Sequence, residues 1–159
     1  MTDKNVSAAL RRLEYGVYVV TMGKGNAGNA FTASWVTQVS SAPPMIALAV
    51  HNKHQSSQLL QEKGAFVLNI IDKDQVAVAK TYYGPAESGY EKLKHASLKV
   101  SPVTGTAMLD GATGYLDCRI VKMVPAGNHT LVLADVVAGE ADGERPILTT
   151  TSSRLHYAG

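Results

Sequence analysis

The polar loop from Asn52 to Ser57 carries the side chains of this sequence that are best suited to holding an anion. Lys53 supplies a positive charge, His54 a possible second one, and Ser56 and Ser57 supply hydroxyl donors. The apolar spacing that follows predicts a short helix, whose first backbone N–H groups would point toward the same place. The segment therefore predicts a site for one terminal phosphate, with a solvated helix cap as the alternative.

His129 is the second candidate for chemistry, because it stands in Gly127-Asn128-His129-Thr130 at the start of an expected strand. A histidine in this position can donate to a ligand or orient a substrate, or it can simply cap a turn. No nucleophile and carboxylate pair with it in the sequence, so a hydrolase triad is not expected. The five histidines are scattered, and we expect no metal site. The lone cysteine, Cys118, lies on an apolar strand face and is expected to be a buried hydrophobic residue.

These candidates must be positioned around the segment from Asn29 to Pro44, NAFTASWVTQVSSAPP, which contains the only tryptophan. As one extended strand it would place hydroxyl-bearing side chains along a single face, with Thr32, Ser34, Val36, Gln38 and Ser40 on that face. Such a strand suits a flat ligand with polar edges, which small side chains allow to approach closely. The alternative is a half-buried antiparallel strand that binds nothing. The double proline ends the segment.

The other predicted elements are mostly strands. Gly23, Gly25 and Gly28 predict a hairpin turn and do not fit a dinucleotide-binding fingerprint. We expect strands over 17–21, 45–50, 65–71, 114–121 and 128–137, and helices over 6–15, 72–82 and between residue 57 and a C-capping Gly64; 84–89 is expected to be loop. This pattern predicts a mainly β protein with short helices, folded as a closed or nearly closed barrel. A parallel α/β sheet fits poorly, because the helical segments are too few and too short.

Composition bounds the remaining possibilities. The 159 residues have a formal net charge of +2 and 45% hydrophobic residues, and we expect one domain over 1–159. So small a net charge argues against nucleic acid as a partner. The longest apolar run, Met45 to Val50, is too short to span a membrane, and the first residues lack a signal-peptide core. We therefore expect no membrane partner and a cytoplasmic location.

Five segments together resemble the flavin reductase-like family of FMN-binding split β-barrels, which includes flavoredoxin. They come in the family's order and cover nearly the whole chain: LEYGVYVVT (13–21), FTASWVTQVSSAPP (31–44), GAFVLNI (64–70), YLDCRI (115–120) and GNHTLVLADV (127–136). The resemblance implies a split, Greek-key-like barrel. It also implies non-covalently bound FMN at a homodimer interface, with both subunits contributing.

The resemblance also implies roles for particular residues. It places Asn29 and the segment Thr32, Ala33, Ser34, Trp35 and Val36 along the isoalloxazine ring, where backbone N–H groups would bond the ring edge. It assigns phosphate binding to Ser56 and Lys92, with Lys53, His54 and Ser57 as their neighbours. It places Ser40 and Ser41 near the ribityl chain or ring edge. His129 would stand on the reactive side of the flavin as the catalytic residue, and Tyr157 over the ring or across the dimer.

Two positions depart from the family pattern. Asn128 stands where the family usually has Asp, and Ala134-Asp135-Val136 replaces a common Gly-Glu-Val. These departures bear more on activity with NADH or NADPH than on FMN binding. The resemblance implies an oxidoreductase that accepts a hydride from NADH or NADPH at flavin N5 and passes electrons to free flavin, a protein or another acceptor. The alternatives are a flavoredoxin-like electron carrier with little NAD(P)H activity, and a non-enzymatic split-barrel protein that holds haem or another ligand.

Overall fold

The computed structural model describes residues 3–24, 28–84 and 93–157. The described elements are α1 (Lys4–Leu10), β1 (Tyr18–Met22), β2 (Asn29–Ala33), β3 (Val36–Ser41), β4 (Pro44–His51), α2 (Gln55–Lys63), β5 (Ala65–Ile70), α3 (Val76–Thr81), β6 (Leu98–Val100), β7 (Ala107–Leu109), β8 (Gly114–Ala126), β9 (His129–Ala141) and α5 (Thr150–Ser153). The prediction of a mainly β protein with short helices is confirmed.

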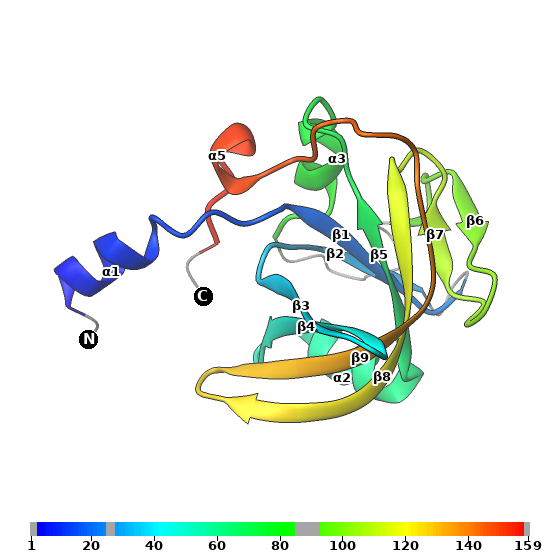
Figure 1. Cartoon of the computed structure of the whole chain (residues 1–159), viewed down its shortest axis with the longest axis horizontal. Coiled ribbons are helices and arrows are strands. Elements are labelled where there is room, and N and C mark those ends of the chain that lie inside the picture. Colours follow the sequence, from blue (N-terminus) through cyan, green and yellow to red (C-terminus); the bar gives the residue numbers. More distant parts are fainter. Residues whose placement is uncertain (1–2, 25–27, 85–92, 158–159) are drawn as a thin grey trace.

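Seven strands form one antiparallel sheet in the order β2-β1-β5-β8-β9-β4-β3. The sheet curls on itself, so that β2 and β3 come near each other although they are its two edges (Figure 1). These two edge strands are consecutive in the chain and are joined only by Ser34 and Trp35. The barrel is therefore split at this seam, and the chain crosses the seam at the tryptophan.

The core lies on both faces of the sheet. β1 alternates between two buried clusters: Val20 and Met22 pack inside the barrel, while Val19, with Val17 just before the strand, packs on the outer face. The inner cluster includes Leu60 of α2, which stands against β1, β2, β4 and β5. The outer cluster is covered by α3 and by the segment that contains Leu148. This double burial explains the nearly continuous apolar runs of the central strands.

A buried polar layer attaches the small β6–β7 hairpin to the main sheet. The Asn69 side chain donates to the Val19 carbonyl (2.9 Å) and the Thr21 hydroxyl (3.0 Å) and accepts from the Leu109 N–H (2.8 Å). The fully buried Asp117 carboxylate accepts from the N–H groups of Val103 and Thr104. Buried polar groups of this kind are tolerated because each has its partners.

The structure corrects three of the sequence expectations. The segment 29–44 is not one strand, because it breaks between Ala33 and Val36 and has a bulge between Gln38 and Ser40. The first helix ends at Leu10 rather than near residue 15, and none of its residues is buried. The helix expected over 72–82 is shorter in the structure, where α3 spans only Val76–Thr81. Most of the loop expected over 84–89 lies outside the described residues.

The remaining predicted elements are confirmed with shifted ends, and Gly64 caps α2 with a left-handed φ of 67°. β6, β7 and α5 were not predicted. Among the helices in the described parts of the chain, none has both the length and the apolar character needed to cross a bilayer.

Candidate functional site

The seam between β2 and β3 is a tight turn centred on Trp35. The Val36 N–H donates to the Ser34 carbonyl at 3.0 Å, which closes a three-residue turn. The Ala49 N–H of β4 donates to the Trp35 carbonyl, also at 3.0 Å. These hydrogen bonds fix the backbone on both sides of Trp35, at the point where the two sheet edges meet.

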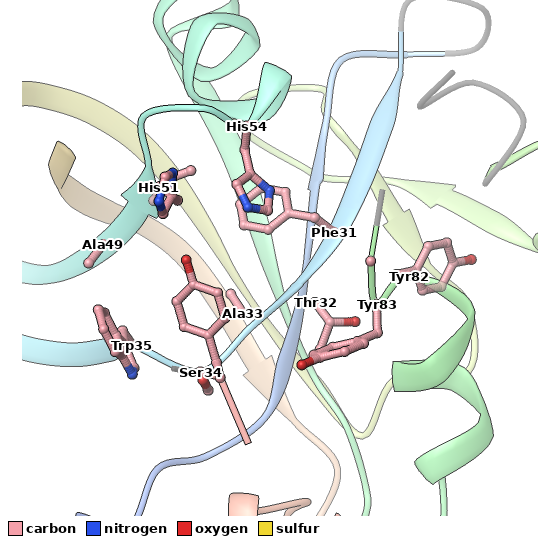
Figure 2. Close-up of a pocket in the computed structure, with 13 residues that line it drawn as sticks. Phe31, Thr32, Ala33, Ser34, Trp35, Ala49, His51, His54, Tyr82 and Tyr83 are labelled. Atoms are coloured by element: carbon pink, nitrogen blue, oxygen red, sulfur yellow. The ribbon is translucent and has the colours of Figure 1, made fainter. Parts of the chain in front are cut away.

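A pocket opens directly on this seam. Its empty volume is about 700 Å³, part of which is open solvent. Figure 2 shows side chains converging on it from β2, the end of β4, the start of α2 and the end of α3. It is lined by Phe31, Thr32, Ala33, Ser34, Trp35, Ala49, Val50, His51, His54, Tyr82, Tyr83, Gly84 and Tyr157.

Two residues that line this pocket each carry a buried polar atom with no hydrogen-bond partner among the described residues. The two atoms are the Ser34 hydroxyl and the Trp35 indole N–H. Ser34 is only 7% exposed. An unpaired buried donor costs about 1–3 kcal/mol. Polar atoms left without partners in an otherwise aromatic pocket are the feature expected where a ligand supplies the missing acceptor.

His129 joins the aromatic side of the pocket, although it stands behind the lining residues. Its ring centroid lies 4.8 Å from that of Trp35, and its Nε2 lies 2.9 Å from the Tyr157 hydroxyl. Tyr157 meets Trp35 edge to face, with centroids 5.0 Å apart. Burial lowers the pKa of His129, and the nearby positive charges of His51 and His54 lower this pKa further. The imidazole is therefore neutral at neutral pH. Burial raises the pKa of Tyr157, so its hydroxyl keeps its proton.

The N-terminus of α2 borders the same pocket through His54, which is its N-cap residue. The His54 side chain makes no capping bond to the helix, so the cap leaves first-turn N–H groups for another acceptor. Ser56 in this first turn is buried, and Ser57 is half-buried. The exposed Lys53 stands just before the helix. A helix end with these neighbours is suited to a phosphate.

The structure brings together part of the predicted site. Of the residues predicted to bind the cofactor, those that line the pocket are Thr32, Ala33, Ser34, Trp35, His54 and Tyr157. Asn29 is buried away from it, and its side-chain oxygen accepts from the Ala30 N–H. Val36, Ser40 and Ser41 run along β3 outside the pocket, and Lys92 lies outside the described residues. The roles assigned to these residues remain predictions.

Two of the backbone N–H groups predicted to bond the ring edge are engaged within the chain. The Thr32 N–H donates to the Tyr82 carbonyl, and the Val36 N–H is used within the seam turn. Neither group is available to a ligand in this arrangement. The Thr32 hydroxyl is also engaged, since it donates to the Ala79 carbonyl at 2.6 Å. Thr32 thus ties β2 to α3.

Sequence reasoning missed several residues of the pocket, chiefly Phe31, Tyr82 and Tyr83. Tyr82 and Tyr83 directly follow α3 and precede Gly84, and paired aromatics at a helix end were the only signal available. The expectation that Cys118 is a buried hydrophobic residue is confirmed, and burial raises the pKa of its thiol to about 12. Within the described ranges, no three His, Cys, Asp or Glu side chains gather closely enough to hold a metal ion.

Two groups of sequence relatives are similar to this chain. The NADH:FMN oxidoreductase of Rhodococcus qingshengii is 30% identical over 139 residues, which cover 86% of this chain and 71% of the relative. Diflavin flavoprotein A 1 of Synechocystis sp. is 29% identical over 139 residues, which cover 86% of this chain and 24% of that protein. The chain therefore spans about a quarter of the length of the diflavin relatives it matches.

Solved structures share the fold, and a family model matches nearly the whole sequence. BorF, the flavin reductase component of a bacterial two-component tryptophan halogenase, superposes with a TM-score of 0.84 at 25% identity over 94% of each chain. The NADH:FAD oxidoreductase SgcE6 of Streptomyces globisporus superposes with a TM-score of 0.81 at 23% identity over 94% of this chain and 91% of SgcE6. The model of the flavin reductase like domain matches residues 10–158. This chain belongs to the flavin reductase-like domain family.

Proposed function

We propose that the pocket at the β2–β3 seam binds FMN non-covalently. The observation that carries this proposal is the pair of unpartnered donors, the Ser34 hydroxyl and the Trp35 indole N–H, in a wall of aromatic side chains. An isoalloxazine ring is flat and apolar on its faces and has hydrogen-bond acceptors along its edge. It would therefore satisfy both donors while it packs against the aromatic rings.

The FMN phosphate would be held at the first turn of α2. The N-cap His54 leaves helix N–H groups without a side-chain partner, and Lys53, Ser56 and Ser57 surround that end of the helix. The charge of Lys53 and the direction of the helix dipole both favour an anion there. Lys92 remains a proposed phosphate ligand on the strength of the family resemblance alone.

We propose that the protein is an oxidoreductase that takes reducing equivalents from NADH or NADPH and passes them to free flavin, a protein or another acceptor. A bound flavin would supply the two-electron chemistry. The residues of this chain would bind and orient it: Trp35 beside the ring, and His129 with Tyr157 as a neutral hydrogen-bonding pair next to it. The name of the Rhodococcus relative supports this activity for the family.

The test is a titration of the purified protein with FMN, followed by anaerobic addition of NADH. Quenching of flavin fluorescence with a one-to-one endpoint supports binding, and rapid bleaching of the flavin absorbance supports a reductase. The Ser56→Ala variant should bind FMN more weakly by about 1–3 kcal/mol, while its affinity for riboflavin, which lacks the phosphate, should not change. An equal loss for both ligands would contradict the assignment of the phosphate to α2.

A second candidate is a flavoredoxin-like electron carrier that reacts poorly with NADH or NADPH. The similarity to one quarter of the diflavin flavoproteins favours it, because a chain of this kind also occurs as a part of larger flavoproteins. Flavin absorbance that persists with NADH but bleaches with dithionite would identify the carrier. For the haem alternative, His129 is a poor axial ligand, since both of its ring nitrogens are already hydrogen-bonded within the chain.

We also propose a homodimer with the flavin at its interface. α1 has no buried residue, and Val6, Leu10 and Leu13 are each about half exposed at this end of the molecule. An apolar face of this kind marks an interaction surface. A cytoplasmic location is a further proposal, which cell fractionation would test.

A further inference from the structure

Two segments that are far apart in the sequence meet at one side of the pocket. Tyr83 comes from the end of α3, and Tyr157 comes from the C-terminal segment that follows α5. The Tyr83 hydroxyl donates to the His156 carbonyl at 3.3 Å and so joins the two segments directly. The pKa of Tyr157 is raised mainly by burial and further by Tyr83, as expected for neighbouring phenols. We call Tyr83, His156 and Tyr157 the rim.

The C-terminal half of the rim is anchored on both sides of His156. Leu155 packs against the outer core cluster, and its N–H donates to the Ser153 hydroxyl at 3.1 Å. The Tyr157 hydroxyl lies 2.9 Å from His129 Nε2. The His156 carbonyl is therefore held from both directions. Tyr83, by contrast, is 45% exposed, so its bond to His156 can break without opening the core.

The other half of the rim is anchored by Thr32 of β2. The Thr32 N–H donates to the Tyr82 carbonyl at 3.0 Å, and the Thr32 hydroxyl donates to the Ala79 carbonyl at 2.6 Å. Both acceptors belong to the end of α3, where backbone carbonyls lack partners within the helix. Thr32 thus fixes this helix end on β2 through two bonds.

This anchoring acts on the residue that comes next in the chain. Tyr82 is 4% exposed and packs in the outer cluster, while Tyr83 turns the opposite way from the end of α3 (Figure 2). With the Tyr82 side chain buried and its carbonyl bound by Thr32, the backbone that leads into Tyr83 is fixed. Thr32 therefore determines where the Tyr83 phenol meets the C-terminal segment.

We propose that Thr32 and Tyr83 are positioning residues that hold the rim closed and thereby set the rate at which flavin enters and leaves the pocket. The proposal rests on the proposed flavin site. The rim bond joins two residues of the chain and needs no ligand, so it opposes entry and exit alike. A single exposed hydrogen bond is weak, which suits a flavin that exchanges with solution rather than one that is permanently enclosed.

This role differs from that of a ligand contact in a measurable way. Loss of a direct contact raises the dissociation rate constant, leaves the association rate constant unchanged and weakens affinity. Loss of a rim bond raises both rate constants together and leaves the affinity nearly unchanged. Tyr83→Phe removes only the rim hydroxyl. Thr32→Val removes the bond to Ala79, and Thr32→Ser keeps a hydroxyl that can restore it.

The test is stopped-flow fluorescence of FMN binding, in which the concentration dependence of the observed rate gives both constants. Tyr83→Phe and Thr32→Val should each raise both on the order of fivefold, with Kd changed by less than about twofold and the double variant no faster than either. Thr32→Ser should match the wild type. Unchanged rates, or a rise in dissociation alone, would overturn the proposal.

Thr81→Val is the matched control. The Thr81 hydroxyl donates to the Ala77 carbonyl at 2.9 Å, so this variant removes the same kind of bond from α3 without affecting the tie to β2. It should exchange FMN at the wild-type rates. Exchange as fast as that of Thr32→Val would show that any weakening of α3 has this effect, and would overturn the role of Thr32.

A second readout needs no flavin. Trp35 is the only tryptophan, lines the pocket and meets Tyr157 edge to face, so its fluorescence reports on the rim. Acrylamide should quench Trp35 more strongly in flavin-free Tyr83→Phe and Thr32→Val than in the wild type or Thr81→Val. Equal quenching in all four proteins would overturn the closed rim. A wild type that binds no FMN would contradict the proposed function, while the quenching would still decide whether these residues hold the rim.

Discussion

At the residue scale, the polar atoms of the pocket fall into two classes. The Thr32 hydroxyl and N–H and the Val36 N–H are satisfied within the chain, whereas the Ser34 hydroxyl and the Trp35 N–H are not. A buried donor without a partner destabilises the flavin-free protein, and it contributes to binding only when a ligand arrives. Stability and affinity should therefore respond in opposite directions to its removal.

Ser34→Ala is the variant that separates these effects. We expect FMN binding to weaken by about 1–3 kcal/mol, because one hydrogen bond to the ligand is lost. The melting temperature of the flavin-free protein should stay the same or rise, since the unpaired hydroxyl is removed. Thermal unfolding and fluorescence titration measure the two quantities. Thr37→Ala on the exposed part of β3 is the control and should change neither. A destabilised variant with unchanged affinity would contradict this assignment.

His129 makes the stability depend on pH in a definite direction. Its pKa in the folded protein is lowered by burial and by the charges of His51 and His54, while the unfolded chain titrates near pH 6.5. Its stabilising contribution is therefore complete above about pH 6.5 and is lost as the pH falls toward the folded pKa.

Urea unfolding of the wild type and of His129→Gln, at several pH values between about 5 and 8, tests this sign. Both proteins share the titration of the other histidines, so the difference in unfolding free energy isolates His129. This difference, wild type minus variant, should shrink as the pH falls. A constant or growing difference would show that the pKa of His129 is not lowered.

At the element scale, local sequence signals located most strands but not the breaks between them. β1, β4 and β5 are short runs rich in apolar and β-branched residues, and their existence followed from composition. The division of 29–44 into β2 and β3 did not follow from composition, because the two residues at the break, Ser34 and Trp35, are neither glycine nor proline. That break is imposed by the tertiary bond from the Ala49 N–H to the Trp35 carbonyl.

The site was predictable to a similar degree. The Ser34–Trp35 donors and the phosphate-binding end of α2 lie in the segments that the sequence singled out. Tyr82 and Tyr83 enter the pocket only because Thr32 binds the end of α3, a contact over 47 residues or more that no local pattern encodes. The prediction that the first helix ends near residue 15 was wrong, because the apolar residues of α1 are not buried within the chain and do not stabilise a longer helix.

Gly64 shows how one residue sets the end of an element. It caps α2 with φ 67°, and a Cβ there would meet no atom within 4 Å. Gly64→Ala should therefore lower the unfolding free energy by about 1–2 kcal/mol through backbone strain alone. Gly111→Ala is the matched control, because its φ is not positive and its Cβ would meet only Gln75 Nε2 at 3.9 Å. Equal effects of both substitutions in chemical denaturation would rule out a role for the left-handed cap.

At the scale of the whole molecule, the seam that forms the pocket is also the place where the barrel is least enclosed. A second pocket lies between α1 and the barrel and shares Trp35 and Tyr157 with the first. α1 itself projects away from the sheet (Figure 1) and exposes Val6 and Leu10, and Leu13 just beyond the helix is also exposed. A second copy that covers this apolar face would therefore press on the same two aromatic residues that border the proposed flavin site.

The double variant Val6→Glu/Leu10→Glu tests this coupling of assembly to binding. Placing two carboxylates on the face should shift a wild-type dimer to monomer in sedimentation equilibrium and weaken FMN binding, because burying unpaired charges costs several kcal/mol. Val100→Glu on β6, which is 65% exposed, is the control and should preserve both assembly and affinity. A wild-type monomer at micromolar concentration would exclude the dimer. A variant that becomes monomeric yet binds FMN as tightly as the wild type would show that one chain completes the pocket by itself.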